Sequence, residues 1–303
     1  MSNIALPKIS EFSFKTLTLA AVAVAGLAWA FLPTLAWMVA KWSDDPQYSH
    51  GFLVPFFSAF LLWRAAKVGP LFGSPRPVLG AAMLVVLVAV RWLAGGLLFH
   101  QLDALALLLS LMAFAVVAGG FKLARAVAPA VVFLVFAIPL PYELEQNVGG
   151  PLKVVATDAS TFLLQTLGLP AVAEGHVILI DDVRLGVVDA CSGLKMLMTF
   201  AAFAVGAVLT LDRTKFEKLM ILFGIVPIAV ITNVLRITAT GVAYTQTADK
   251  GVQHVLHDVH GWLMMPVGLA LLAGQLWVLA RLVIRPAAPL TATPGYGFMP
   301  AVA

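Results

Sequence analysis

The chain contains eight long runs of apolar residues, separated by shorter segments that carry most of its charge. A helix needs about 20 mostly apolar residues to cross the hydrocarbon core of a bilayer, so each run predicts a membrane-spanning helix. Only 11% of the 303 residues are charged, whereas about 25% is usual in soluble domains. The sequence therefore predicts an all-α polytopic membrane protein. The expected spans are residues 15–40, 48–63, 77–99, 103–121, 126–141, 191–211, 218–244 and 259–281.

The charges of the loops give these spans an orientation. Alternate loops hold 12 of the 19 basic residues, whereas the opposite loops hold 12 of the 15 acidic residues. By the positive-inside rule we expect both termini in the cytoplasm and the acidic loops outside the cytoplasmic (inner) membrane. The basic residues form no patch with interleaved aromatic side chains, so nucleic-acid binding is not indicated. We expect residues 1–285 to form a single multipass membrane domain and residues 286–303 to form a disordered tail.

The segment 142–190, between the fifth and sixth spans, is the one long loop on the outer side. Between residues 152 and 169, apolar residues recur with helical spacing opposite polar ones, which predicts an exofacial amphipathic helix on the membrane surface. Residues 176–180 and 183–188 flank a polar turn and predict a small β-hairpin. This hairpin leads the chain into Cys191 at the start of the sixth span.

Cys191 is the only cysteine of the chain. It therefore forms neither an intramolecular disulfide nor a Cys-rich metal site, and is either a small hydrophobic residue or a nucleophile. A helix N-terminus and nearby cations favour the reactive thiolate. Cys191 lies where a polar loop enters a span, and Lys195 follows one turn later on the same face. These surroundings favour the nucleophile.

Other ionisable residues inside the spans fall on the same outer side. Arg236 lies in the outer half of the seventh span, and His257 lies near the start of the eighth. Ionisable groups cost about 2.5–3.5 kcal/mol each to insert, so their presence suggests function. A histidine can accept the thiol proton and later protonate a leaving amine, and an arginine can donate hydrogen bonds to an oxyanion. Cys191, Arg236 and His257 thus form a complete set for acyl transfer through a thioester.

Simpler roles are open for several of these residues. Arg236 could extend to the membrane surface or pair with Asp103. Lys195 is better explained as an electrostatic neighbour of Cys191 than as a catalytic base. His100 and His176 are best explained as ordinary histidines at the membrane interface.

A histidine cluster at His254, His257 and His260, with Asp258, would also permit a metal site. Positions spaced by three drift around a helix, however, and do not converge on one ion as an i, i+4 pair does. The chain also contains no HExxH motif. We therefore expect no catalytic metal and no cofactor.

Five further segments stand out along the chain: Tyr48-Ser-His50-Gly51-Phe52-Leu-Val-Pro55, Ile138-Pro-Leu-Pro141, Ala190-Cys191-Ser192-Gly193-Leu-Lys195, Asn233-Val-Leu-Arg236-Ile237 and His257-Asp258-x-x-Gly261-Trp262. These segments, in this order, resemble motifs of the exosortase/archaeosortase family of multipass membrane transpeptidases. The resemblance covers residues 45–280. It implies that Cys191 is the nucleophile, Arg236 the transition-state stabiliser and His257 the acid/base. The residues expected to support the reaction or bind substrate are His50, Ser192, Gly193, Lys195, Asn233 and Asp258.

The resemblance also implies a substrate and an acceptor. Such enzymes are understood to act as cysteine proteases or transpeptidases on exported proteins with a C-terminal sorting signal, PEP-CTERM in bacteria. The signal is a short motif followed by a transmembrane helix and a basic tail. The new C-terminus passes to an acceptor such as a lipid or glycan, in a cell-surface context linked to exopolysaccharide.

The residues alone leave two other function classes open. A transporter or channel would use Arg91, Lys195 and Arg236 inside the spans, although the inner halves of the spans hold few polar groups. A metal-dependent intramembrane protease would use the histidine cluster. A non-catalytic scaffold gives no reason for ionisable groups to gather around a thiol.

Overall fold

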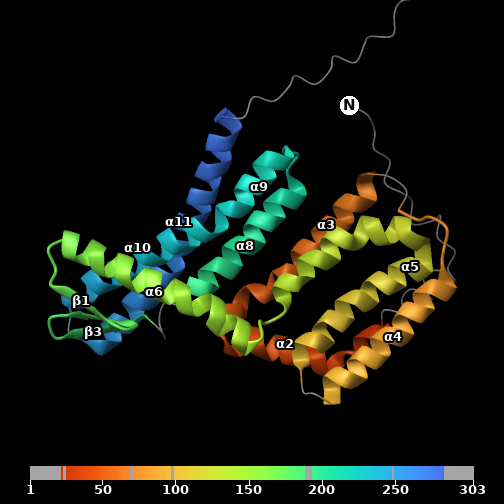
Figure 1. The fold of residues 1–303 in the computed structure, drawn as a ribbon, viewed down its shortest axis with the longest axis horizontal. Coiled ribbons are helices and arrows are strands. Elements are labelled where there is room, and N and C mark those ends of the chain that lie inside the picture. The colour runs from red at the N-terminus through yellow and green to blue at the C-terminus, as the bar shows by residue number, and fades with distance from the viewer. Residues whose placement is uncertain are drawn as a thin grey trace, which may run out of the picture.

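The computed structural model describes residues 22, 25–68, 71–96, 99–187, 193–247 and 249–282. The first half contains α2 (Leu32–Asp44), the 3₁₀ helix η2 (Pro46–Phe52), α3 (Val54–Val68), α4 (Pro77–Gly96), α5 (His100–Phe133) and the 3₁₀ helix η3 (Leu134–Ala137). The second half contains α6 (Tyr142–Thr166), β1 (Ala171–Glu174), β2 (Val177–Ile180), β3 (Val183–Gly186), α8 (Gly193–Thr210), α9 (Lys215–Phe223), α10 (Ile225–Thr245) and α11 (Lys250–Leu282). Figure 1 shows α2 to α5 on one side of the molecule and α8 to α11 on the other.

Six segments among these residues are long and apolar enough to cross a membrane. Five of them coincide with the expected second, third, sixth, seventh and eighth spans. The expected fourth span and most of the fifth fall within one segment, and the first lies partly outside the described residues. The helical multipass architecture is thus confirmed, whereas the count of eight is not. The six segments are Gln47–Val68, Pro77–Gly96, His100–Ala137, Gly193–Thr210, Lys215–Thr245 and Val259–Leu282.

The segment His100–Ala137 turns sharply near the predicted break between the fourth and fifth spans. Its 38 residues would make a straight helix about 57 Å long, nearly twice the hydrocarbon thickness of about 30 Å. Gly120 interrupts it with φ 65° and ψ −160°, a combination that is essentially restricted to glycine. Figure 1 shows the chain turning back at this point, so α5 consists of two arms.

The region before α8 contains one long helix and a sheet. α6 includes most of the predicted amphipathic helix but begins ten residues earlier, directly after Pro141. It is not among the six candidate spans. The predicted hairpin is part of a three-stranded antiparallel sheet in the order β1-β2-β3. The strand β1 was not predicted, because Ala171-Val-Ala-Glu174 contains a single β-branched residue.

Buried clusters join these elements, and two of them include α8. One cluster packs α6 and the sheet on α10 through Leu164, Ile178 and Ile237, which are fully buried. A second packs α8 against α9, α10 and α11 around Phe200. Further along α8, Leu209 and its neighbours pack against the cluster of α2, α3 and α5. α8 therefore connects the two halves of the molecule.

Candidate functional site

α8 begins at Gly193, directly after the segment that carries the predicted nucleophile. Gly193 is buried, and an added Cβ would lie 3.3 Å from Nδ2 of Asn233 and 3.6 Å from Cβ of Leu152. The absence of a side chain thus lets the start of α8 approach α10 and α6 closely. Cys191 and Ser192 lie in the stretch 188–192, outside the described residues.

Arg236 lies one turn after Asn233 on the same face of α10. Both side chains are buried, with exposed fractions of 7% and 1%. The guanidinium packs on α11, where a Cβ added to Gly261 would lie 3.4 Å from Nη2 and 3.7 Å from Cζ of Arg236. Because a guanidinium keeps its charge and carries five N–H donors, Arg236 supplies a fixed positive charge between α10 and α11.

The predicted acid/base, His257, lies on α11 one turn before Gly261. At 3.6 residues per turn, positions 257 and 261 differ by about 40° around the helix, whereas positions 260 and 261 differ by about 100°. Position 257 therefore belongs to the face of α11 that Gly261 presents to Arg236. The side chains of His257, His254 and Asp258 lie outside the part of the chain that the structure describes.

His260 is the member of the histidine cluster whose side chain is described. Its Nδ1 lies 3.3 Å from Oγ1 of Thr240, and it interacts electrostatically with Arg236. Thr240 is fully buried. We did not predict its part in the site, although it lies four residues after Arg236 and so on the same face of α10. The Thr240 bond holds the ring of His260 beside the buried arginine.

The opposite face of the first turn of α8 carries Lys195. Gly193 and Lys195 are two residues apart and therefore differ by about 200° around the helix. Lys195 is half-buried and interacts electrostatically with His50 of η2. Nδ1 of His50 lies 3.2 Å from the carbonyl oxygen of Gln47. Lys195, on the face of α8 that points away from Asn233, is thus close enough to His50 for their charges to interact.

Two of the five motif segments contact each other, residues 48–55 and residues 138–141. The Tyr48 hydroxyl accepts a hydrogen bond from the backbone N–H of Leu140 at 3.2 Å and donates to Oε2 of Glu145 at 3.5 Å. These bonds connect η2 with the entry into α6. They fix the segment that carries His50.

Arg91, the third cation predicted inside a span, takes part in a separate contact. Its Nε lies 3.4 Å from Oδ1 of Asp103, and its guanidinium carbon lies 4.1 Å from the ring centroid of Phe31. Thr34 donates a hydrogen bond to the same carboxylate. Asp103 is therefore the partner of Arg91 and not of Arg236, so the alternative that paired Asp103 with Arg236 is wrong.

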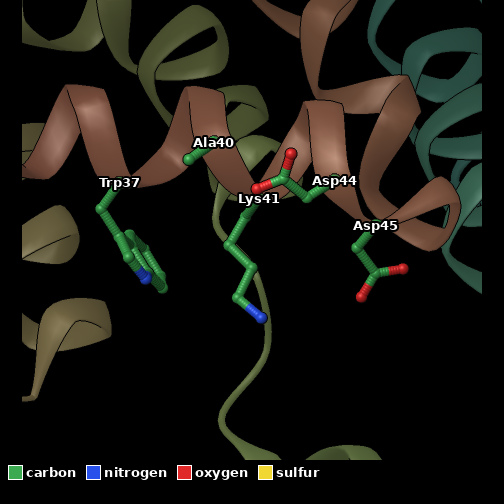
Figure 2. Close-up of a pocket in the computed structure, with 5 residues that line it drawn as sticks. All are labelled: Trp37, Ala40, Lys41, Asp44 and Asp45. Carbon is green, nitrogen blue, oxygen red and sulfur yellow. The ribbon is translucent and has the colours of Figure 1, made fainter.

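A pocket of about 400 Å³ opens at the end of α2, away from Arg236. Figure 2 shows Lys41 between Trp37 and Asp45 along one side of the helix end. Trp37 also stacks on His100, with ring centroids 5.0 Å apart. This pocket therefore combines an aromatic surface with charges of both signs. Its lining residues are Trp37, Ala40, Lys41, Asp44 and Asp45.

The described side chains form no metal-binding group. Within that part of the chain, no three His, Cys, Asp or Glu residues are arranged to bind one ion. The predicted histidine cluster depends on His254 and His257, whose side chains lie outside the part of the chain that the structure describes. The metal-protease alternative thus stays a hypothesis.

One known family matches most of this chain. The family model described as transmembrane exosortase (Exosortase_EpsH) matches residues 42–274, which is most of the chain. No curated protein and no solved structure matches. The matched region includes all five motifs, from Tyr48 to Trp262, and hence the residues of α8, α10 and α11 that meet around Arg236. The chain therefore belongs to the transmembrane exosortase family.

Proposed function

We propose that this exosortase is a cysteine transpeptidase that cleaves the C-terminal sorting signal of exported proteins through a thioester. The supporting observation is the junction of three helices. Gly193 of α8 contacts Asn233, and Arg236, one turn further along α10, contacts Gly261 of α11. Cys191 precedes the first of these glycines by two residues, and His257 precedes the second by one helical turn. Exosortases are membrane transpeptidases or proteases, so the proposal assigns that chemistry to named residues.

In the proposed reaction His257 accepts the thiol proton of Cys191, and the thiolate attacks the scissile carbonyl carbon. The guanidinium of Arg236 donates hydrogen bonds to the oxyanion of the tetrahedral intermediate. Collapse of this intermediate breaks the C–N bond, and His257 gives its proton to the departing amine. The nucleophile of the acceptor, deprotonated by His257, then attacks the thioester and releases the thiolate. Water in place of the acceptor would give hydrolysis.

The neighbouring residues have supporting roles in this proposal. Asn233 holds the start of α8 in register with α10. Lys195 contributes positive charge near the thiol, which favours the thiolate. His50 lies within range of the charge of Lys195. His260, fixed by Thr240, stabilises the α10–α11 contact and does not exchange protons with substrate.

The catalytic assignment is tested by co-expression with an exported protein that carries a C-terminal motif, a transmembrane helix and a basic tail. Cys191→Ala, Arg236→Ala and His257→Ala should each abolish the size shift of the substrate without loss of the enzyme. His260→Gln is the matched control and should retain most of the processing. Added hydroxylamine should intercept the thioester and appear as a hydroxamate on the cleaved protein. Normal processing by Cys191→Ala would refute the mechanism.

The proposal also places the site at the outer face of the cytoplasmic membrane, with both termini inside and a lipid or glycan as acceptor. Because Cys191 is the only thiol, its side of the membrane can be measured directly. A membrane-impermeant maleimide should label intact spheroplasts, and Cys191→Ser should remove the signal. Labelling that occurs only in inverted vesicles would contradict the outer placement.

A further inference from the structure

The turn between the two arms of α5 is joined to the loop that precedes α4. The backbone N–H of Gly73 donates to the carbonyl of Gly119 at 3.1 Å, and that of Arg76 donates to Val116 at 3.2 Å. A Cβ at Gly73 would lie 2.8 Å from Cβ of Lys122, so the stem of Lys122 lies against this loop. Because each arm is apolar and long enough to approach the thickness of a bilayer, the turn lies at a membrane surface.

A pocket of about 340 Å³ opens at this turn; we call it the turn pocket. Lys122 and Arg125 are three residues apart and thus lie on one face of the second arm. Arg76 approaches from the start of α4, with its guanidinium carbon 5.0 Å from the ring centroid of Phe121. Two cations therefore line the hollow, and a third, Arg76, lies beside the aromatic ring that forms part of its wall. Its lining residues are Phe121, Lys122, Arg125 and Ala126.

Acidic residues are scarce in the stretch of chain that forms the turn pocket. The only acidic residue in the stretch 71–137 is Asp103, which lies at the other end of the first arm and binds Arg91. The pocket of Figure 2 differs, because one lysine is accompanied there by two aspartates. Of these two pockets, the turn pocket is the one whose charge favours an anion.

We propose that the turn pocket binds the phosphate of an anionic phospholipid headgroup. Its volume falls within the range of about 300–1,000 Å³ that is usual for small-molecule sites. Lys122, Arg125 and Arg76 supply charge-assisted hydrogen bonds to the phosphate oxygens. Phe121, half of whose side chain is exposed (51%), offers an apolar surface to the glycerol and acyl carbons. A free phosphate would make no use of that surface, so a lipid is the better match.

The test is a titration of thermal unfolding in detergent with phosphatidylglycerol, phosphatidylcholine or inorganic phosphate. Phosphatidylglycerol should stabilise the wild-type protein at lower concentrations than phosphatidylcholine does. Each surface cation contributes roughly fivefold to the affinity for an anionic lipid, so Lys122→Gln/Arg125→Gln should weaken phosphatidylglycerol binding about 30-fold. The matched control is Lys215→Gln/Lys218→Gln, which removes the same charge from α9 and should leave the affinity unchanged. If the double variant folds poorly, Arg125→Gln alone should lose roughly fivefold.

Three results would overturn the proposal. One is equal stabilisation of the wild-type protein by the two lipids. Another is an equal loss of affinity in the α9 control, which would mean that net charge, and not the turn pocket, attracts the lipid. The third is full stabilisation by inorganic phosphate alone, which would identify the ligand as a free anion. Since none of these cations belongs to the proposed catalytic set, failure here would leave the transpeptidase proposal untouched.

Discussion

The contact between α8 and α11 can be tested at Gly268. A Cβ added there would overlap the buried ring of Phe200, with the most distant of three affected ring carbons 2.7 Å away. That carbon alone would have to retreat by about 0.8 Å to reach a normal carbon–carbon distance of about 3.5 Å, and the other two would have to retreat further. Phe200 is 1% exposed, so its ring has no free space to enter. α11 must therefore move away from α8.

Overpacking of this kind typically destabilises by about 1–3 kcal/mol. We expect Gly268→Ala to lie near the upper end, about 2–3 kcal/mol, because the overlap involves a rigid ring and not the end of a flexible chain. The matched control is Gly274→Ala on the same helix, where an added Cβ meets nothing within 4 Å. There the better helix propensity of alanine should leave stability unchanged or raise it by up to about 1 kcal/mol.

Thermal unfolding of both variants in the same detergent measures the difference in their stability. Substrate processing below the melting temperature measures how that difference affects activity. Because α11 also carries His257 and Gly261, Gly268→Ala should slow processing while Gly274→Ala should not. Equal stability of the two variants would refute the close packing of Phe200 on Gly268.

Three further substitutions test other contacts by the same unfolding measurement. Gly51→Ala places a Cβ 2.6 Å from Cε2 of Trp42 and should destabilise by about 1–3 kcal/mol; a neutral result would show that the indole can move. Arg91→Gln leaves the Asp103 carboxylate without its cation and should cost about 2–3 kcal/mol, less than the 3–5 kcal/mol of fully buried pairs, because these side chains are 26% and 18% exposed. The double variant Arg91→Leu/Asp103→Leu should recover much of the lost stability. If it recovers none, the ion pair between the two residues is not what the single substitution disrupts. Gly120→Ala should cost about 1–3 kcal/mol because of its backbone angles; unchanged stability would contradict the turn in α5.

The membrane-spanning segments were predictable because a bilayer constrains each one separately. Apolarity over about 20 residues is a local property, so no knowledge of neighbouring helices was needed. The reversal in α5 was also indicated, since Lys122 and Arg125, two and five residues after Gly120, interrupt the apolar run. The strand β1 was missed because it depends on pairing with β2, which its own four residues do not signal.

The residues of the candidate site could be proposed from the sequence, whereas the contacts of its described residues could not. Arg236 stood out from the sequence because an arginine inside a span is costly and rare. Its contact with Gly261 could not be anticipated, because it depends on how two separate helices pack. The same holds for Thr240, an unremarkable residue by type, whose role beside His260 follows from helix packing.

The described residues that flank the proposed nucleophile are both buried against α10. Val187 is fully buried, in one cluster with Ile237 of α10, and Gly193 is buried against Asn233 of the same helix. Arg236 lies one turn from Asn233 on the same helix, so α10 holds both the guanidinium and the described residues that flank the proposed nucleophile. The lone cysteine, the buried arginine and α11 can therefore be tested as one unit. A substitution that loosens the packing of α10 should disturb the positions of all three together.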